Sequence, residues 1–275
     1  MLKVKVLFEK RALLLEEQEE KCGEQASLTS SADREGRRRF IVVGDLHIGF
    51  EEKFQSAGVK LNSNQATMLN EIVELVKETH ATDLIINGDV KSGTDRILKS
   101  EWENVPRFFT RLLEHTRVHI ILGNHDGGLS YLVPAGVELI DSNGFYISDT
   151  LILHGHTRPL AKFAMCKRLV MGHVHPIFQR RGNPLTGQPV WIFLKVERSA
   201  IFPEAIVENL SAPVDVILMP SFNLDLVVAG YSADAAKEER RVAPLVRELK
   251  SASEAIVTTL KGDVIGNASL LPSTL

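Results

Sequence analysis

The sequence predicts an α/β fold, a four-layer αββα sandwich in which two mixed β-sheets pack together with helices on the outer faces. Two observations lead to this prediction. Over residues 40–122, short apolar runs alternate with amphipathic helical segments, the order typical of a parallel sheet covered by helices. Beyond Gly127 and Gly128 the pattern changes to shorter β runs, which supply a second sheet.

The amino-terminal region predicts a hairpin, a loop and a first strand. Two β-like runs, Leu2–Phe8 and Ala12–Leu15, flank a charged turn and indicate an edge hairpin. Residues 16–39 mix Glu, Gln, Ser and Arg without apolar periodicity, which is typical of a loop. Phe40–Val43 is then the first strand of the alternating region.

Two amphipathic helices separate the next strands. Apolar residues three and four positions apart predict a helix from about Asn64 to Thr79 and another around Glu101–His115. We expect Pro106 to lie within about the first turn of the second helix, where proline is tolerated. Leu84–Ile86 follows the first helix and Val118–Leu122 the second, which completes a β-α-β-α-β order.

The carboxyl-terminal half supplies the remaining strands. Arg181–Gly187 has the composition of a hairpin loop, Ala235–Leu249 of a helix, and Ala255–Val264 of a pair of edge strands. We expect a single domain over residues 1–275, with a core at about 40–225 and the terminal hairpin, helix and strands as additions. The other predicted strands are Leu151–Leu153, Leu169–Met171, Val190–Leu194 and Val214–Met219.

Composition places the chain among ordinary globular proteins, with 44% apolar and 24% charged residues. The net charge of -3 supplies no global attraction for nucleic acid, although it leaves a local basic face open. Cys22 and Cys166 lie far apart and indicate neither a disulfide scaffold nor a thiolate metal site. No apolar run reaches the length of a membrane span and no signal peptide is recognisable, so we expect a cytoplasmic protein without membrane association.

Polar side chains gather where the predicted strands end, which is the edge at which open α/β sheets bind ligands. Their oxygen and imidazole donors suit first-row metals such as manganese, iron or zinc, whereas a calcium cage needs more carboxylates. In an extended segment, residues two apart point the same way, so each Asp-x-His or His-x-His pair is expected to aim two ligands into one cleft. These residues are Asp45, His47, Asp89, Asn124, His125, His154, His173 and His175.

Taken singly, a histidine at a strand end is more often a satisfied polar residue than a ligand, and a glycine beside it can be an ordinary turn residue. We leave His80, His115 and His119 in that class, because they lie away from the strand ends. Five such endings in one chain are a much more specific signal. Together they predict a two-metal phosphoesterase centre.

The five endings resemble the motifs of the calcineurin-type metallophosphoesterase superfamily: Asp-x-His, Gly-Asp, Gly-Asn-His-Asp/Glu, a lone His and Gly-His-x-His. The chain carries them as Asp45-Leu46-His47, Gly88-Asp89, Gly123-Asn124-His125-Asp126, His154 and Gly172-His173-Val174-His175. The chain also resembles archaeal phosphoesterases related to the SbcD repair nucleases and a bacterial DNA-repair-associated phosphoesterase. This further resemblance rests on Asp45–Glu52, Ala57–Val59, the Gly-His-x-His-Pro ending and Met219–Asn223.

The resemblance implies two divalent metal ions, manganese first, with iron, zinc, nickel and magnesium as alternatives. It assigns Asp89 to both ions, which two-metal sites hold about 3.5–4 Å apart. It also implies attack on phosphorus by a metal-bound hydroxide, with His125 donating a proton to the leaving group, a role worth about 10²–10⁴-fold. Asp126 either orients His125 or caps a turn, and the role of His156 is left open, with lining the pocket as one alternative. The remaining implied ligands are Asp45, His47 and His175 for the first ion, and Asn124, His154 and His173 for the second.

One position departs from the SbcD-like pattern, in which a second histidine follows the bridging aspartate at the third position. Here that residue is Ser92, which cannot share an imidazolium proton. The metal core is unaffected, but the change argues against a double-strand nuclease. Lys91 and Arg158 are candidates for binding a substrate phosphate, although a solvated surface charge is the more ordinary role for each.

The chain is therefore predicted to be a dinuclear metal-dependent phosphoesterase that hydrolyses phosphodiester or phosphomonoester bonds. The resemblance favours nucleic acid or nucleotides as substrates, in a DNA-repair context. One alternative is a small-molecule phosphatase or cyclic-nucleotide phosphodiesterase, and another is a metal-binding scaffold for repair factors. Partners are then the phosphate-ester substrate and no membrane, and a homodimer is one open possibility for the oligomeric state.

Overall fold

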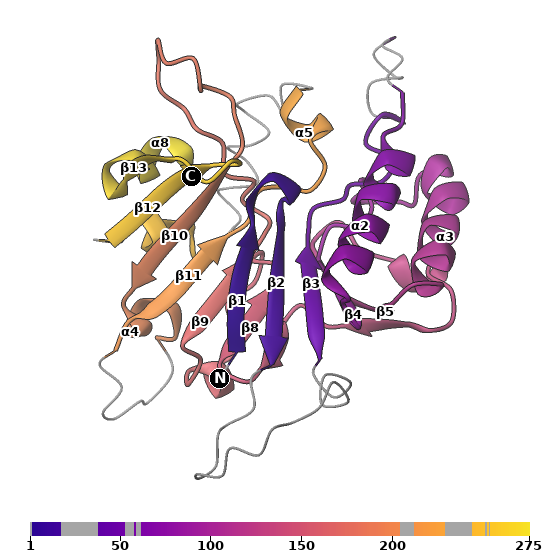
Figure 1. Cartoon of the computed structure of the whole chain (residues 1–275), viewed down its shortest axis with the longest axis horizontal. Coiled ribbons are helices and arrows are strands. Elements are labelled where there is room, and N and C mark those ends of the chain that lie inside the picture. Colours follow the sequence, from indigo (N-terminus) through magenta and orange to yellow (C-terminus); the bar gives the residue numbers. More distant parts are fainter. Residues whose placement is uncertain are drawn as a thin grey trace, which may run out of the picture.

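The structure is a computed structural model that describes residues 2–17, 38–52, 58, 62–203, 212–228, 244–250, 252 and 254–275. Its strands form two mixed sheets (Figure 1), as the sequence predicts. Across the first sheet the strands run, in order, β1 (Leu2–Leu7), β2 (Ala12–Glu17), β3 (Arg39–Val43), β4 (Asp83–Asn87), β5 (Arg117–Ile121) and β6 (Val137–Ile140).

The second sheet has seven strands. Within it β11, β9 and β8 are parallel neighbours, and the remaining pairs are antiparallel. The order across this sheet is β13 (Val264–Asn267), β12 (Glu254–Thr259), β10 (Val190–Val196), β11 (Val214–Leu218), β9 (Arg168–Met171), β8 (Thr150–Leu153) and β7 (Phe145–Ile147).

In the first sheet β3, β4, β5 and β6 are parallel, and the hairpin of β1 and β2 adds two antiparallel strands beside β3. Carboxyl ends of parallel strands meet at one edge, where ligands bind in such sheets. The loops after β3, β4 and β5 are therefore brought together by the strand register alone. These loops carry the first three of the predicted motifs.

Side-chain alternation along β3 divides the core into layers. Phe40 and Val42 belong to the cluster between the two sheets, which also contains Trp191 of the second sheet. Ile41 and Val43 point the other way and pack against the long helices. These helices, α2 (Gln65–Thr79) and α3 (Lys99–Leu113), cover the outer face of the first sheet (Figure 1).

Short helices cover the second sheet on its outer face. Leu249 of α7 (Val246–Lys250) and Leu271 of α8 (Leu271–Thr274) are fully buried in the core on that side, together with Ile201 of α4 (Arg198–Ile201). Another short helix, α5 (Asp225–Val228), follows β11. The predicted four-layer αββα arrangement is thus confirmed. Among the helices in the described residues, none combines the length and apolarity that a bilayer span requires.

Two details differ from the predictions. Pro106 is the eighth residue of α3, so the prediction that it lies in about the first turn is wrong. The helix begins earlier because Glu101 reaches back to accept a hydrogen bond from Leu98 N at 2.7 Å, which caps the helix start. The strands β6 and β7, of four and three residues, were not predicted because runs this short carry little periodicity.

Some sequence predictions fall partly on residues that are not described. Residues 18–37 of the predicted loop and residues 235–243 of the predicted helix lie outside the described residues, as does Cys22. The hairpin predicted around Arg181–Gly187 is confirmed. Phe178 N, before the turn, donates to Gln188 O, after the turn, at 2.8 Å.

Candidate metal centre

The loops after β3 and β4 run side by side and bring three candidate ligands together. Asp45 N donates to Gly88 O at 3.1 Å, and His47 N donates to Asp89 O at 2.9 Å. A parallel β-bridge between Ile48 and Lys91, which lies in the loop after β4, continues this pairing beyond the ends of the strands. Because these bonds are between backbone atoms, the approach of Asp45, His47 and Asp89 is fixed by the fold.

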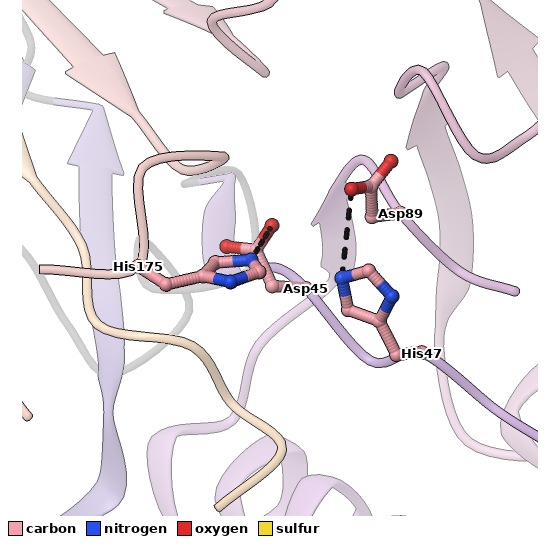
Figure 2. Close-up of side chains that lie close together, drawn as sticks. All are labelled: Asp45, His47, Asp89 and His175. Atoms are coloured by element: carbon pink, nitrogen blue, oxygen red, sulfur yellow. Dashed lines mark ion pairs between the residues drawn. The ribbon is translucent and has the colours of Figure 1, made fainter. Parts of the chain in front are cut away.

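Four residues form a first cluster with atoms that could ligate one cation. The ligand atoms of Asp45, His47, Asp89 and His175 lie within 4.8 Å of one another, and all four residues are buried. His175 Nε2 is 3.0 Å from Asp45 Oδ1, and His47 Nε2 is 3.5 Å from Asp89 Oδ2 (Figure 2). The structure therefore brings together the residues that the sequence assigns to the first ion.

Asp89 also belongs to a second cluster, with His154 and His173. His154 Nε2 lies 3.3 Å from Asp89 Oδ2 and 3.2 Å from Asn124 Oδ1. The other ring nitrogen of His154 donates to Asn87 O at 2.9 Å, which turns Nε2 toward the cluster in the way that outer partners orient metal-binding histidines. All four residues predicted for the second ion meet here.

The donor atoms fit divalent cations. Asp45 Oδ2 is buried without a hydrogen-bond partner among the described residues, and a buried polar oxygen is costly unless it gains a partner such as a cation. Burial raises the pKa of Asp89, but the neighbouring His154 imidazole outweighs burial and holds that pKa well below its usual range. Burial lowers the pKa of His154, yet the Asp89 carboxylate raises it to about 10. The carboxylates thus draw positive charge into the centre.

Two of the motif glycines make room for ligand side chains. A Cβ on Gly88 would lie 2.2 Å from His154 Nδ1, and a Cβ on Gly123 would lie 2.2 Å from Asp89 Oδ1. Both distances are far below any real Cβ contact, so a side chain at either position would displace His154 or Asp89, the candidate ligand beside it. These glycines are therefore more than ordinary turn residues.

The ligand pairs do not lie in extended segments, so that part of the sequence prediction is wrong. The candidate ligands with positive φ are Asp45 (58°), His47 (43°), Asp89 (51°), His173 (64°) and His175 (39°). Such left-handed backbone costs about 1–3 kcal/mol per residue and persists where the surrounding structure enforces it, often at functional sites. The turned backbone lets His173 face the second cluster while His175 faces the first.

His125 lies beside the clusters. Its Nε2 is 3.9 Å from Asp89 Oδ2, and its ring centroid is 4.8 Å from that of His47. Its Nδ1 is 2.9 Å from Ser92 O, a carbonyl that can only accept, so Nδ1 carries a proton. The backbone of Ser92 therefore orients this ring, with Nε2 toward the centre.

Asp126 makes hydrogen bonds of the turn-capping kind. Its Oδ1 accepts from Val90 N at 2.9 Å, and its Oδ2 accepts from Gly123 N at 2.8 Å. The carboxylate thereby ties the loop after β5 to the loop after β4. Burial, together with the negative Asp89, raises the pKa of Asp126 to about 6.

The other sequence candidates occupy different surroundings. Lys91 is fully buried and its Nζ donates to Gly93 O, so its predicted role as a solvated surface charge is wrong. Arg158 forms an ion pair with Glu248 at 2.5 Å. His156 packs against the ring of His154, and burial with the charge of His154 lowers its pKa to about 4.

Ser221 and Asn223 have a structural role that the sequence did not predict. Both side chains are buried and donate hydrogen bonds to the loop after β3 that carries Asp45 and His47, called here the first ligand loop. The acceptors are Asp45 O and Leu46 O. The only sequence signal for them was the resemblance of Met219–Asn223 to the SbcD-related branch.

Several solved structures are distantly similar to this chain. The nuclease MPE of Pseudomonas putida is 21% identical over 67% of this chain and 74% of that chain, with a TM-score of 0.44. A protein of unknown function from Aquifex aeolicus, AQ665, is 17% identical over 52% and 81%, with a TM-score of 0.35. Yfce, a phosphoesterase from E. coli, is 17% identical over 52% and 74%, with a TM-score of 0.31.

No curated protein matches the sequence significantly. The family model described as calcineurin-like phosphoesterase matches residues 38–230, which include both clusters and the loops that carry them. The family, whose members are metal-dependent phosphoester hydrolases with two divalent ions, is the one that the five motifs resemble. The chain belongs to the calcineurin-like phosphoesterase family.

Proposed function

We propose that this chain hydrolyses phosphodiester bonds with the aid of two divalent cations that share Asp89. The observation that carries the proposal is the pair of buried clusters that meet at this carboxylate. Bound cations supply Lewis-acid stabilisation of the phosphoryl oxygens and lower the pKa of an attacking water. The proposed ligands are Asp45, His47, Asp89 and His175 for the first ion, and Asp89, Asn124, His154 and His173 for the second.

His125 is the proposed proton donor to the leaving group. Its Nδ1–H is held by Ser92 O, which leaves Nε2 directed at the centre near Asp89. A proton on Nε2 would be available to the leaving oxygen of a phosphoester bound at the centre. Asp126 serves this group through the backbone, because its hydrogen bonds fix the loop in which His125 stands.

Manganese is the proposed activating metal. The donor set combines carboxylate and amide oxygens with imidazole nitrogens, a mixture that suits borderline first-row ions. Metal-free protein reconstituted in parallel with Mn²⁺, Fe²⁺, Zn²⁺, Ni²⁺ and Mg²⁺ tests this choice. The highest turnover with Mn²⁺ is expected, and equal or greater turnover with another ion would replace it.

Nucleic-acid ends or nucleotides are the proposed substrates, on the basis of the resemblance to the SbcD-related branch. Ser92 favours a second candidate, a phosphatase or cyclic-nucleotide phosphodiesterase that acts on small molecules, because a nuclease-type histidine partner for His125 is replaced by serine. Ser92 Oγ is buried without a hydrogen-bond partner among the described residues, so it does not substitute for that partner.

Two assays in sequence test the function. Manganese-dependent hydrolysis of bis-p-nitrophenyl phosphate is expected, and its absence in protein that binds two ions would favour a metal-binding scaffold over an enzyme. Single- and double-stranded DNA with defined ends, cyclic nucleotides and phosphomonoesters are then compared by kcat/KM. A preference for DNA ends supports the nucleic-acid proposal, whereas a preference for cyclic nucleotides or monoesters supports the small-molecule alternative.

A further inference from the structure

The segment Ser221–Asn223 lies along the backbone of the first ligand loop. Three successive carbonyls of that loop, from Gly44 to Leu46, accept hydrogen bonds from this segment. The bonds are Phe222 N to Gly44 O (3.0 Å), Asn223 N to Asp45 O (3.3 Å), Ser221 Oγ to Asp45 O (3.0 Å) and Asn223 Nδ2 to Leu46 O (2.9 Å). The segment therefore fixes the orientation of each peptide unit that carries Asp45 and His47.

The first ligand loop needs such support. Asp45 and His47 both have positive φ, at 58° and 43°, a conformation that residues other than glycine adopt uncommonly and at an energetic cost. The hydrogen bonds to Gly44–Leu46 supply part of this constraint. A loop released from them would keep its backbone bonds to the loop after β4 but would hold its two candidate ligands less firmly.

Arg11, which belongs to the amino-terminal hairpin, contacts the segment Ser221–Asn223 and holds it in place. Its Nε donates to Phe222 O at 3.2 Å, and its guanidinium carbon lies 4.9 Å from the centroid of the Phe222 ring. Nη2 forms an ion pair with Glu71 of α2 at 2.5 Å. Arg11 is only 7% exposed, which is unusual for arginine and consistent with a structural task.

The position of Arg11 in the chain is informative. It stands in the turn between β1 and β2, which lies at the same end of the molecule as α5, the helix that follows Ser221–Asn223 (Figure 1). The family match begins at residue 38, so the hairpin lies outside the part of the chain that the family model covers. The hairpin nevertheless reaches the scaffold of the metal centre through one side chain.

We propose that Arg11 is a positioning residue for the cation held by Asp45, His47, Asp89 and His175. It acts through the Phe222 peptide and the segment Ser221–Asn223, which together fix the loop carrying Asp45 and His47. The second cation takes His154 and Asn124 from other loops, so it depends less on this support. The inference rests on the ligand assignment proposed above.

Calorimetric titration of metal-free protein with Mn²⁺ tests this, because it reports two dissociation constants. His175→Ala identifies the constant of the first ion, and His173→Ala that of the second. Arg11→Met keeps the aliphatic stem and removes the guanidinium. We expect it to weaken the first ion about tenfold, the lower end of the range for residues that orient metal ligands, and the second ion much less.

Two further variants sharpen the test. Arg11→Lys retains a cation beside Glu71 and is expected to recover part of the lost affinity. Lys3→Met is the control, since Lys3 stands on the same hairpin, is exposed and forms an ion pair across the hairpin with Glu16 at 3.6 Å. It is expected to change neither constant.

The inference is overturned if Arg11→Met leaves both constants unchanged, or weakens both ions equally while lowering the Tm of the metal-free protein. The hairpin would then stabilise only the fold. Should Arg11→Met fail to fold, Ser221→Ala removes a single donor to Asp45 O and must still weaken the first ion selectively. If His175→Ala leaves both constants unchanged, the ligand assignment itself fails. If His175→Ala removes one ion and Arg11→Met shifts neither constant, only the role of Arg11 fails.

Discussion

The two ends of the first sheet each bury carboxylates beside histidines, yet among the described residues the clusters that could hold a metal ion lie at one end. At the amino end of β4, Asp83 accepts hydrogen bonds from Arg38, Arg117 and His119 at 2.8–3.0 Å. At the carboxyl end, Asp45 Oδ2 has no hydrogen-bond partner among the described residues. Asp83 is thus paired with two guanidinium groups, whereas the carboxylates at the other end face imidazoles, which are the side chains that can share a metal ion with them.

The two ends of the first sheet also differ in the hydrogen-bond partners of their histidines. His119 lies between two carboxylates, with Nε2 2.8 Å from Asp83 and Nδ1 2.7 Å from Glu138. Both of its nitrogens are thus engaged by the chain's own acids. His154 has one nitrogen bonded to a backbone carbonyl and the other turned toward Asp89 and Asn124. A histidine with one nitrogen anchored and the other facing a carboxylate is the pattern of a metal ligand.

The largest effect that this comparison predicts is at Asp89, the residue shared by both clusters. Asp89→Ala is expected to reduce the metal content from two ions to none and to abolish turnover, because each ion loses a ligand that it shares with the other. Elemental analysis of the purified variant checks this. Two ions retained in the variant would show that Asp89 does not bridge.

A smaller loss of metal and activity is expected from a substitution at Gly88, which is not itself a candidate ligand. Gly88→Ala would place a Cβ 2.2 Å from His154 Nδ1, so we expect it to lose the second ion and most activity. Gly182→Ala is a matched control, since Gly182 has the same φ of 77°, and in the described part of the chain no residue beyond its two chain neighbours lies within 4 Å of its Cβ position. Metal content should differ between the two variants. Equal metal content would show that the backbone angle, and not the space for His154, explains this glycine.

His125→Ala is expected to keep both ions and to lose turnover only where the leaving group needs a proton. The expected decrease is about 10²–10⁴-fold on a substrate with a poor leaving group, the range for general acid catalysis. On bis-p-nitrophenyl phosphate the decrease should be much smaller, because p-nitrophenolate leaves without protonation. A comparable decrease on both substrates would contradict the proton-donor role.

Much of the fold could be predicted because its signals are local. The alternation of strands and helices over residues 40–122 follows from apolar periodicity, and parallel strands place their carboxyl ends together without further information. The short strands β6 and β7 could not be predicted, since runs of four and three residues carry little periodicity. The burial of Lys91 was missed because no pattern in its local sequence indicates that this lysine is buried.

The candidate ligands could be predicted from sequence, but not the means by which they are held. Asp45 and His47 were expected in extended backbone, whereas both are left-handed under constraints that come from Ser221–Asn223. Those contacts join residues separated by 176 positions or more, and no local pattern encodes them. Arg11 likewise gives no sign in the sequence that it reaches Phe222.

The smallest effect on function is expected at the opposite end of the sheet. Asp83→Asn should leave both ions and turnover unchanged but should lower the free energy of unfolding by about 3 kcal/mol, the lower end of the range for breaking a buried ion pair. The lower end applies because the Arg38 and Arg117 side chains are themselves partly exposed to solvent. Urea unfolding of the metal-free protein measures this change, and a loss of metal in the variant would contradict the separation of the two ends.

The Asp83 carboxylate also makes the free energy of unfolding depend on pH. Burial raises the pKa of Asp83, but hydrogen bonds from Arg117 and Arg38 outweigh burial and hold the pKa well below its usual range. Its stabilisation is therefore fully present above the unfolded-state pKa of about 4 and is lost as the pH falls toward the folded-state value. Because the asparagine side chain of the variant does not titrate, the difference in unfolding free energy between wild type and Asp83→Asn should shrink below about pH 4. A difference that stays constant from neutral pH down to about one unit below that pKa would mean that the Asp83 charge does not contribute to stability.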